Sequence, residues 1–298
     1  MSLRIHAARL AGDRPIRLVE AGGRPGAVRD RRQTGVRLLP PLDSTAMPDV
    51  RDSFSRVAAN YSKSTFHTSS VRLQEVLDLA RPKRGDLALD VATGTGNTAF
   101  ALAPYVRRVI GLDVTREMLD EARRVAAERD VVNTDWVIGD ASHLPFQDDT
   151  FDLYVVRAAP HHFPDIDRFL AEAYRVLKPD RDAAFVDCAP PLPARDVLHE
   201  VEMRRDPSHV LSLTVDEWVA RLEAAGFEVG MAEVRELDWN YEEWMNNMAV
   251  AAELAAELAQ VIDASSGEAR TQLHPEWREG KLWHAYWHAL IRARKPGG

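Results

Sequence analysis

The sequence predicts a doubly wound α/β fold: a seven-stranded sheet, mostly parallel with the last strand antiparallel, with helices on both faces and a C-terminal helical insertion. Two observations lead to this prediction. From residue 87 onward, short apolar runs alternate with amphipathic segments, the pattern of parallel strands joined by helical crossovers. The first run, LALDV, also leads directly into the glycine-containing loop ATGTGN, which is typical of a strand-to-helix turn in such folds.

The individual elements follow from apolar periodicity and from helix-breaking residues. Ahead of the sheet, helical patterns begin at Arg51 and again near 71–79, where Pro82 ends the second. We expect strands at 87–92, 108–114, 136–138, 151–156, 183–188, 227–239 and 283–293. We expect the intervening helices at 98–105, 115–129, 165–177 and 214–225. Thr214 and Glu217 have the spacing of a capping box at the start of the last of these helices.

These elements divide the chain into five segments. In order they are a leader at 1–47, lid helices at 48–80, a core at 81–239, a helical cap over the substrate at 240–281, and a final strand and tail at 282–298. The leader holds nine arginines, no lysine and four acidic residues, and its Gly and Pro content predicts disorder. An over-extended reading frame that truly starts at Met47, a disordered tail and a targeting segment remain open as explanations of the leader.

Composition restricts the function. The chain has 298 residues and a formal net charge of −8, which disfavours nucleic-acid binding through phosphate contacts. Its single cysteine, Cys188, excludes an internal disulfide and a cysteine-based zinc site, and we expect no metal. No apolar run approaches the roughly 18 residues of a membrane span, and no secretory signal is visible. We therefore expect a cytoplasmic protein.

The glycine loop fits two kinds of ligand. Gly94 and Gly96, with Ala99 three residues later, formally satisfy the dinucleotide fingerprint. Asp90 at the end of the first strand disfavours it, because a carboxylate there repels a pyrophosphate and suits a ligand that carries an ammonium group. Thr93 is β-branched, so we expect it to extend the first strand by one residue.

Acidic residues also end the second and third strands. Asp113 lies seventeen residues after Gly96, the spacing expected of a group that binds ribose hydroxyls, although it could merely cap the next helix. Asp140 lies beside the backbone amide of Ala141, and the two could hydrogen-bond an adenine edge or simply begin a turn. Successive parallel strands place these residues at one edge of the sheet, where ligands of open α/β sheets bind.

The fourth strand end supplies basic residues to the same edge. The segment RAAPHHF contains Arg157, His161 and His162. The two histidines could contact the ligand, or they could form a loop pair that packs beside Phe163. The four strand ends occur in the right order, which makes a chance arrangement improbable.

Four segments of the sequence resemble a known protein family. The segments ALDVATGTGNTAFALA, VIGLDVTREMLDEARR, GDASHLPFQDDTFDLYVVRAAPHHF and FLAEAYRVLKPDR resemble the class I S-adenosylmethionine-dependent methyltransferases, in particular the ubiquinone/menaquinone-biosynthesis methyltransferase-like group. The resemblance runs from about Phe54 to Val186. It implies a Rossmann-like fold, S-adenosyl-L-methionine as cofactor and a small-molecule methyl acceptor. These motifs are specific for fold and cofactor, and they say little about the acceptor.

The resemblance implies a role for each matching position. The positions that would contact the cofactor are Tyr61, Asp90, Ala92, Gly94, Gly96, Asp113, Val114, Met118, Asp140, Ala141 and Arg157. Among them, Asp90 would contact the methionine ammonium and Asp113 both ribose hydroxyls. Val114 and Met118 would flank the adenine, and Tyr61 would close over the sulfonium as a lid.

Methyl transfer mainly requires alignment of the reactants and exclusion of water. A hydroxyl or an activated carbon would also have to lose a proton, and His161 or His162 is the fitting base. Five of the seven tryptophans lie from Trp239 onward, which suits an aromatic or apolar acceptor, or an ordinary core. The acceptor atom is an oxygen, carbon or nitrogen, and a homodimer stays open.

Two other functions share part of this sequence pattern. An NAD(P)-dependent oxidoreductase would need a small residue in place of Asp90 and a hydride-transfer set such as Tyr-x-x-x-Lys, which the sequence lacks. A catalytically inactive methyltransferase-fold protein could bind S-adenosyl ligands as a regulatory or scaffolding subunit, and it shares every cofactor motif. Only an activity measurement separates that alternative from an enzyme.

Overall fold

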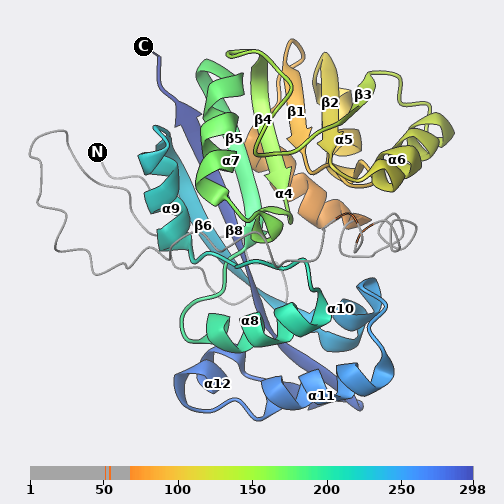
Figure 1. The fold of residues 1–298 in the computed structure, drawn as a ribbon, viewed down its shortest axis with the longest axis vertical. Helices are drawn as coiled ribbons and strands as arrows, with labels where there is room; N and C mark the ends of the chain where they lie inside the picture. The colour runs from red at the N-terminus through yellow and green to blue at the C-terminus, as the bar shows by residue number, and fades with distance from the viewer. Residues whose placement is uncertain (1–50, 52–53, 55–67, 298) are drawn as a thin grey trace, which may run out of the picture.

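One mixed β-sheet runs through the molecule in the strand order β3-β2-β1-β4-β5-β8-β6 (Figure 1). The computed structural model describes Arg51, Phe54 and residues 68–297. Strands β1 to β5 pair in parallel, and β8 is antiparallel to both β5 and β6. This path is the predicted doubly wound sheet with its last strand antiparallel. A short additional strand, β7, pairs with β8 and was missed in the sequence.

The bounds of the elements are as follows. The strands are β1 Leu87–Val91, β2 Arg108–Asp113, β3 Thr134–Ile138, β4 Phe151–Arg157, β5 Leu177–Cys188, β6 Glu228–Asn240, β7 Glu276–Arg278 and β8 Lys281–Lys295. The helices and 3-10 turns are α4 Ser70–Ala80, α5 Asn97–Leu102, η2 Ala103–Tyr105, α6 Arg116–Glu128, η3 Pro160–His162, α7 Ile166–Val176, α8 Ala194–Arg205, α9 Val215–Ala224, α10 Tyr241–Asn247, α11 Ala252–Asp263 and α12 Gly267–Leu273.

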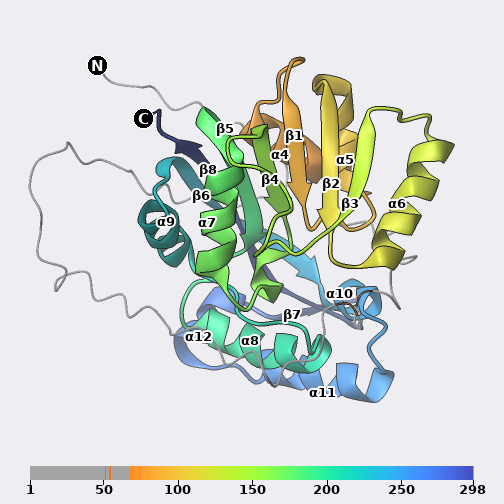
Figure 2. The same cartoon turned by 45° about the horizontal axis from the view of Figure 1, so that its top comes forward.

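Helices cover both faces of the sheet, as predicted. On one face α4 and α5 bury Leu79 and Leu102 against the sheet, and on the other α7 and α9 bury Phe169 and Trp218. Figures 1 and 2 show α7 and α9 on the side opposite α4. Because helices pack on both faces of the sheet, these apolar contacts keep the strands in position, and with them the edge at which the parallel strands end.

A helical unit lies beyond the carboxyl ends of the parallel strands (Figure 2). It contains α8, α10, α11 and α12, and α8 packs against α11 and α12. The β8 residues before His288 extend past the end of β5, pairing only with β6 and β7. Buried side chains of this unit include Leu198, Trp244 and Leu258. Much of segment 240–281 is helical, as predicted, whereas α8 was not predicted.

Several local predictions can be compared with the structure. The capping box at the start of α9 is present, with the Glu217 N–H donating to the Thr214 hydroxyl and the Thr214 N–H donating to the Glu217 carboxylate. The prediction that Thr93 extends the first strand is wrong, because β1 ends at Val91 and the chain turns at Ala92 with a φ of 52°. Among the described residues, no helix is long and apolar enough to cross a membrane.

Candidate active site

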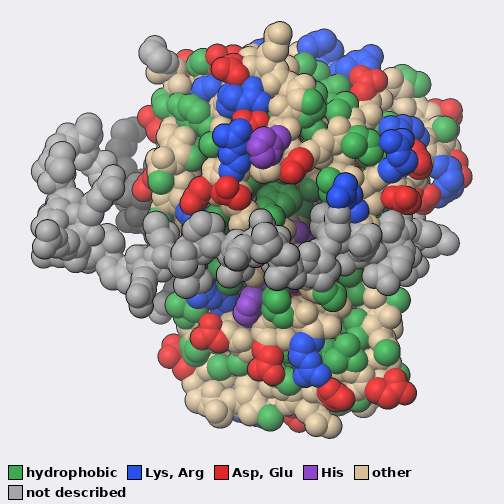
Figure 3. All heavy atoms as spheres, in the orientation of Figure 1, with side chains coloured by type: hydrophobic (Ala, Val, Ile, Leu, Met, Phe, Trp, Pro, Cys, Tyr) green, Lys and Arg blue, Asp and Glu red, His purple; other side chains and the backbone are tan. Residues whose placement is uncertain are grey.

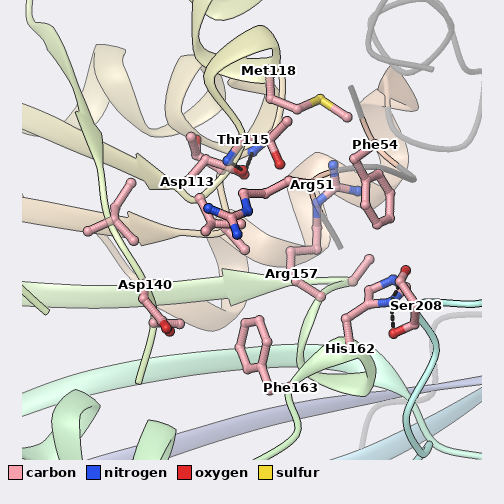
Figure 4. Close-up of a pocket in the computed structure, with 18 of the residues that line it drawn as sticks. Arg51, Phe54, Asp113, Thr115, Met118, Asp140, Arg157, His162, Phe163 and Ser208 are labelled. Carbon is pink, nitrogen blue, oxygen red and sulfur yellow. Dashed lines mark hydrogen bonds between the residues drawn. The ribbon is translucent and has the colours of Figure 1, made fainter. Parts of the chain in front are cut away.

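A pocket of about 510 Å³ lies at the carboxyl edge of the parallel strands (Figure 4). Its wall comes from the ends of β1, β2, β3 and β4, from η3 and from the segment after α8. The predicted residues that line it are Ala92, Gly94, Asp113, Val114, Met118, Asp140, Ala141, Arg157 and His162. Asp90, Gly96 and His161 are not among its lining residues. Tyr61 lies outside the described residues, so its predicted role stays a prediction.

The two loop glycines serve different purposes. Both have left-handed backbones, with φ of 55° at Gly94 and 86° at Gly96. A Cβ added at Gly94 would meet no atom of the described residues within 4 Å, and Gly94 lines the pocket. A Cβ added at Gly96 would lie 2.7 Å from the Trp136 ring and 2.9 Å from the Phe100 ring. Gly94 therefore provides an open surface for a ligand, whereas Gly96 permits close packing.

Asp90 lies beneath the loop and is 1% exposed. The Thr93 hydroxyl donates a hydrogen bond of 2.5 Å to its Oδ2. Burial raises the pKa of Asp90 to about 7, against the opposing effects of this hydrogen bond and the positive charge of Arg157. Arg157 donates from Nε to the Thr98 hydroxyl at 3.0 Å, and burial lowers its pKa to about 10. Asp90 is thus a buried carboxyl behind the pocket wall, and Arg157 is a guanidinium in that wall.

Asp113 connects the end of β2 to the glycine loop. Its Oδ2 accepts the N–H of Gly94 at 2.8 Å, and its Oδ1 accepts the N–H of Thr115 at 2.8 Å. Burial raises the pKa of Asp113, while these two N–H groups act in the opposite direction. The Thr115 side chain and the Val114 backbone also act on this carboxylate and lower its pKa. The side chain lines the pocket, which suits a ligand with adjacent hydroxyls.

Asp140 begins a turn and also lines the pocket. Its Oδ1 accepts the N–H and the hydroxyl of Ser142, both at 2.8 Å. The interpretation that Asp140 begins a turn is therefore correct. It is compatible with a ligand contact, because both Asp140 and Ala141 line the pocket.

His161 and His162 occupy different electrostatic environments although their ring centroids are 4.1 Å apart. Burial alone would lower the pKa of His161, but the charge and hydrogen bond of Asp187 outweigh it and raise the pKa well above the ordinary value. Burial lowers the pKa of His162, and the nearby positive charge of His161 lowers it further. At neutral pH His161 is therefore a cation, and His162 is neutral.

Several residues of this region were not predicted from the sequence. Phe54 packs edge-on against the His162 ring with centroids 5.1 Å apart, and Phe163 lines the pocket beside it (Figure 4). Ser208 also lines the pocket and contacts His162. Asp187 is the second-to-last residue of β5, and its position near the end of a fifth strand was the signal that could have identified it.

Charge on the surface is mixed. Figure 3 shows acidic and basic side chains interspersed on the face that it presents, both on the sheet domain and on the helical unit below it. Arg204 pairs with Glu257, and Arg205 pairs with Glu202.

Comparisons with known proteins agree with this site. Residues 89–185 match a family model described as a methyltransferase domain. The uncharacterized methyltransferase YcgJ of Bacillus subtilis is 33% identical over 219 residues, covering 73% of this chain and 87% of that protein. Its crystal structure has a TM-score of 0.70 and 30% identity, covering 76% of this chain and 98% of the other. A demethylmenaquinone methyltransferase of Lactobacillus johnsonii is 35% identical over 151 residues, covering 48% of this chain and 62% of that protein.

These relatives decide between the two interpretations of the glycine loop. The matched region contains the loop, Asp90, Asp113, Asp140 and the histidine pair, and YcgJ is covered over most of its length. The backbone of Gly94 and the carboxylate of Asp113 both line the pocket, and they fit the amino-acid and ribose parts of an adenosyl cofactor. The chain belongs to the class I S-adenosylmethionine-dependent methyltransferases, and S-adenosylmethionine is its cofactor.

Proposed function

We propose that this enzyme transfers the methyl group to an oxygen, carbon or nitrogen of a small aromatic or apolar molecule. The observation that carries the proposal is the position of His162, which lines the same pocket as Asp113 and Asp140. A neutral imidazole thus lies where a methyl acceptor can approach the cofactor. Phe54, Phe163 and Val210 add apolar surface around it. When bound, S-adenosylmethionine supplies an electrophilic methyl group.

The residues of the chain take distinct parts in this proposal. Asp113, Asp140 and Gly94 bind and orient the cofactor, with Asp90 and Arg157 setting the charge behind the loop. His162 accepts the proton of the acceptor, because its ring is neutral and faces the pocket. His161 is already protonated in its pair with Asp187, so it is not available to act as the base.

The acceptor class is supported by one relative. The demethylmenaquinone methyltransferase acts, by its name, on demethylmenaquinone, and this chain matches 62% of its length. We extend from this only the general class, a flat apolar ring system, and we propose that the helical segment 240–281 covers it. None of the five C-terminal tryptophans lines the described pocket, so the aromatic lining proposed here comes from Phe54 and Phe163. A cytoplasmic location and a homodimer stay predictions.

The test is methyl transfer from labelled S-adenosylmethionine to a panel of phenols, quinols and amines. We expect turnover of at least one panel member, and His162→Gln should lower kcat by about 10²-fold or more without changing cofactor affinity. His274→Asn is the matched control, since His274 pairs with Glu236 in the helical unit and is not among the residues that line this pocket. Tight cofactor binding with no turnover of any panel member would favour the scaffolding alternative.

A further inference from the structure

A second buried carboxylate lies beside His162. Asp206 follows α8 and is 2% exposed. Its Oδ1 accepts the hydroxyl of Ser208 at 2.7 Å and the N–H of Ser208 at 3.0 Å. Its Oδ2 lies 3.9 Å from Nε2 of His162. A buried carboxylate is costly unless it is paired, and both His162 and Arg205 lie close enough to lower the pKa of Asp206.

Ser208 determines which nitrogen of His162 is basic. Nδ1 of His162 lies 3.2 Å from the Ser208 carbonyl oxygen and 3.2 Å from its hydroxyl oxygen (Figure 4). A carbonyl oxygen can only accept, so Nδ1 carries the proton in the neutral ring. The unprotonated nitrogen is then Nε2, the atom closest to Asp206.

The charges around His162 oppose its protonation with one exception. The imidazolium of His161 and the guanidinium of Arg205 both lower the pKa of His162, whereas Asp206 raises it. Arg205 is held in turn by Glu202 at 2.8 Å and lies over the Trp244 ring. If His162 takes a proton during turnover, Asp206 is therefore the group that stabilises the new charge.

We propose that Asp206 is the counter-charge for His162 in the transition state, that Ser208 is the positioning residue that fixes its tautomer, and that the acceptor accordingly bears a removable proton on oxygen or on an acidic carbon. This inference rests on the proposed function and narrows it. A neutral amine needs no base to attack a methyl group, so His162 and Asp206 would accelerate its methylation little. The methylation of a hydroxyl group would be accelerated most, because the hydroxyl must lose its proton.

The proposed step is methyl transfer to a hydroxyl oxygen of the acceptor. The acceptor oxygen attacks the methyl carbon, a C–O bond forms, and the C–S bond breaks with its electron pair left on sulfur. As the C–O bond forms, the O–H proton becomes strongly acidic and passes to Nε2 of His162. A weakly basic ring is sufficient at that stage. The carboxylate of Asp206 then balances the positive charge of the imidazolium. The proton leaves Nε2 for solvent after the methyl ether departs.

The experiment compares two acceptors that differ in ionisation. A hydroxynaphthalene is protonated at the assay pH, whereas its nitro-substituted analogue is largely ionised and needs no base. With Asp206→Asn we expect kcat for the protonated acceptor to fall about 10²-fold. With the ionised analogue, kcat should change by less than about threefold. Asp196→Asn, on the exposed side of α8 and 74% exposed, is the matched control.

The comparison separates a positioning role from a structural one. Equal losses with both acceptors would mean that Asp206 only maintains the fold, and would overturn the inference. Turnover of amines but of neither naphthol by the wild type would also overturn it, while leaving the proposed function intact. No turnover of any acceptor would count against the proposed function itself. If Asp206→Asn does not fold, Ser208→Ala with the same two acceptors gives the same contrast, with a smaller loss.

Discussion

His161 and Asp187 form a two-point contact at the end of β5. Nδ1 of His161 lies 2.6 Å from Oδ1 of Asp187, and the backbone N–H of His161 donates to Oδ2 at 2.8 Å. The side chains are 13% and 2% exposed, so little water screens the pair. The same carboxylate therefore fixes the backbone of η3, the orientation of one histidine ring and its positive charge.

Asp187→Asn should destabilise the protein in a pH-dependent way. Removing one partner of a buried pair costs about 3 kcal/mol. His161 has a folded pKa raised above its unfolded value of 6.5, so its stabilisation is full below that pH and disappears as the pH rises through the folded pKa. The difference between wild type and variant, measured by urea unfolding, should thus be largest near pH 6 and shrink at alkaline pH.

A surface carboxylate provides the control for this measurement. Asp180 is 68% exposed and pairs with Arg294 at 3.2 Å, so Asp180→Asn should change the free energy of unfolding by less than about 1 kcal/mol at any pH. A constant loss across the pH range in Asp187→Asn would contradict the ion-pair assignment and indicate a packing effect instead.

The glycine loop yields a contrast between two substitutions. Gly96→Ala should lower the thermal midpoint markedly, because its Cβ meets the rings of Trp136 and Phe100. Gly94→Ala should cost only about 1 kcal/mol for its left-handed backbone, yet weaken cofactor binding, because its methyl group projects into free space at the pocket wall. Calorimetry with S-adenosylhomocysteine and thermal unfolding measure the two effects. Equal cofactor affinity in Gly94→Ala and wild type would argue that the ligand does not approach this backbone.

The sequence predicted one wall of the pocket because each of its residues lies at or just after a strand end. Parallel pairing of the strands brings Asp113, Asp140 and Arg157 to the same edge of the sheet, where they line the pocket. The acceptor side was less predictable. Ser208 and Asp206 reach His162 only because α8 folds back beneath the sheet edge, and a contact across 46 residues leaves no local pattern.

The start of β5 and the helix α8 were missed for physical reasons that the structure shows. The start of β5 reads Leu-Lys-Pro-Asp-Arg, which is too polar for a buried strand. Lys178 and Arg181 are nevertheless stabilised there because both pair with Asp152 on β4, at 2.9 and 3.0 Å. Helix α8 lacks a clear apolar stripe, since it carries the buried acid Glu202 among its apolar positions. Both cases depend on partners far away in the sequence.

Asp113→Ala should weaken cofactor binding through the ribose. Loss of two charge-assisted hydrogen bonds, worth about 1.5 to 3 kcal/mol each, corresponds to roughly 10²-fold or more in dissociation constant. The variant also loses the contacts to Gly94 and Thr115, so affinity alone is ambiguous. A 2′-deoxy analogue of S-adenosylhomocysteine resolves this: wild type should bind it more weakly than the parent compound, and Asp113→Ala should not distinguish the two. Asp120→Ala is the control, because the Asp120 side chain on α6 is 60% exposed.

Cofactor binding should release a proton from Asp90 near neutral pH. Its pKa of about 7 in the free protein means that the carboxyl is about half protonated there. For folding, the raised pKa gives stability that is full below pH 3.8 and is lost as the pH rises through about 7. An ammonium group bound nearby favours the carboxylate, so binding should displace the proton and affinity should rise with pH up to about 8.

Calorimetry of S-adenosylmethionine binding at pH 6.5 in phosphate and in imidazole, whose ionisation enthalpies differ, counts the protons exchanged. Because the amine of the ligand can itself exchange protons, the decisive quantity is the difference between wild type and Asp90→Asn. A net release in the wild type that vanishes in the variant supports the ammonium contact, and identical proton counts would place the ammonium elsewhere.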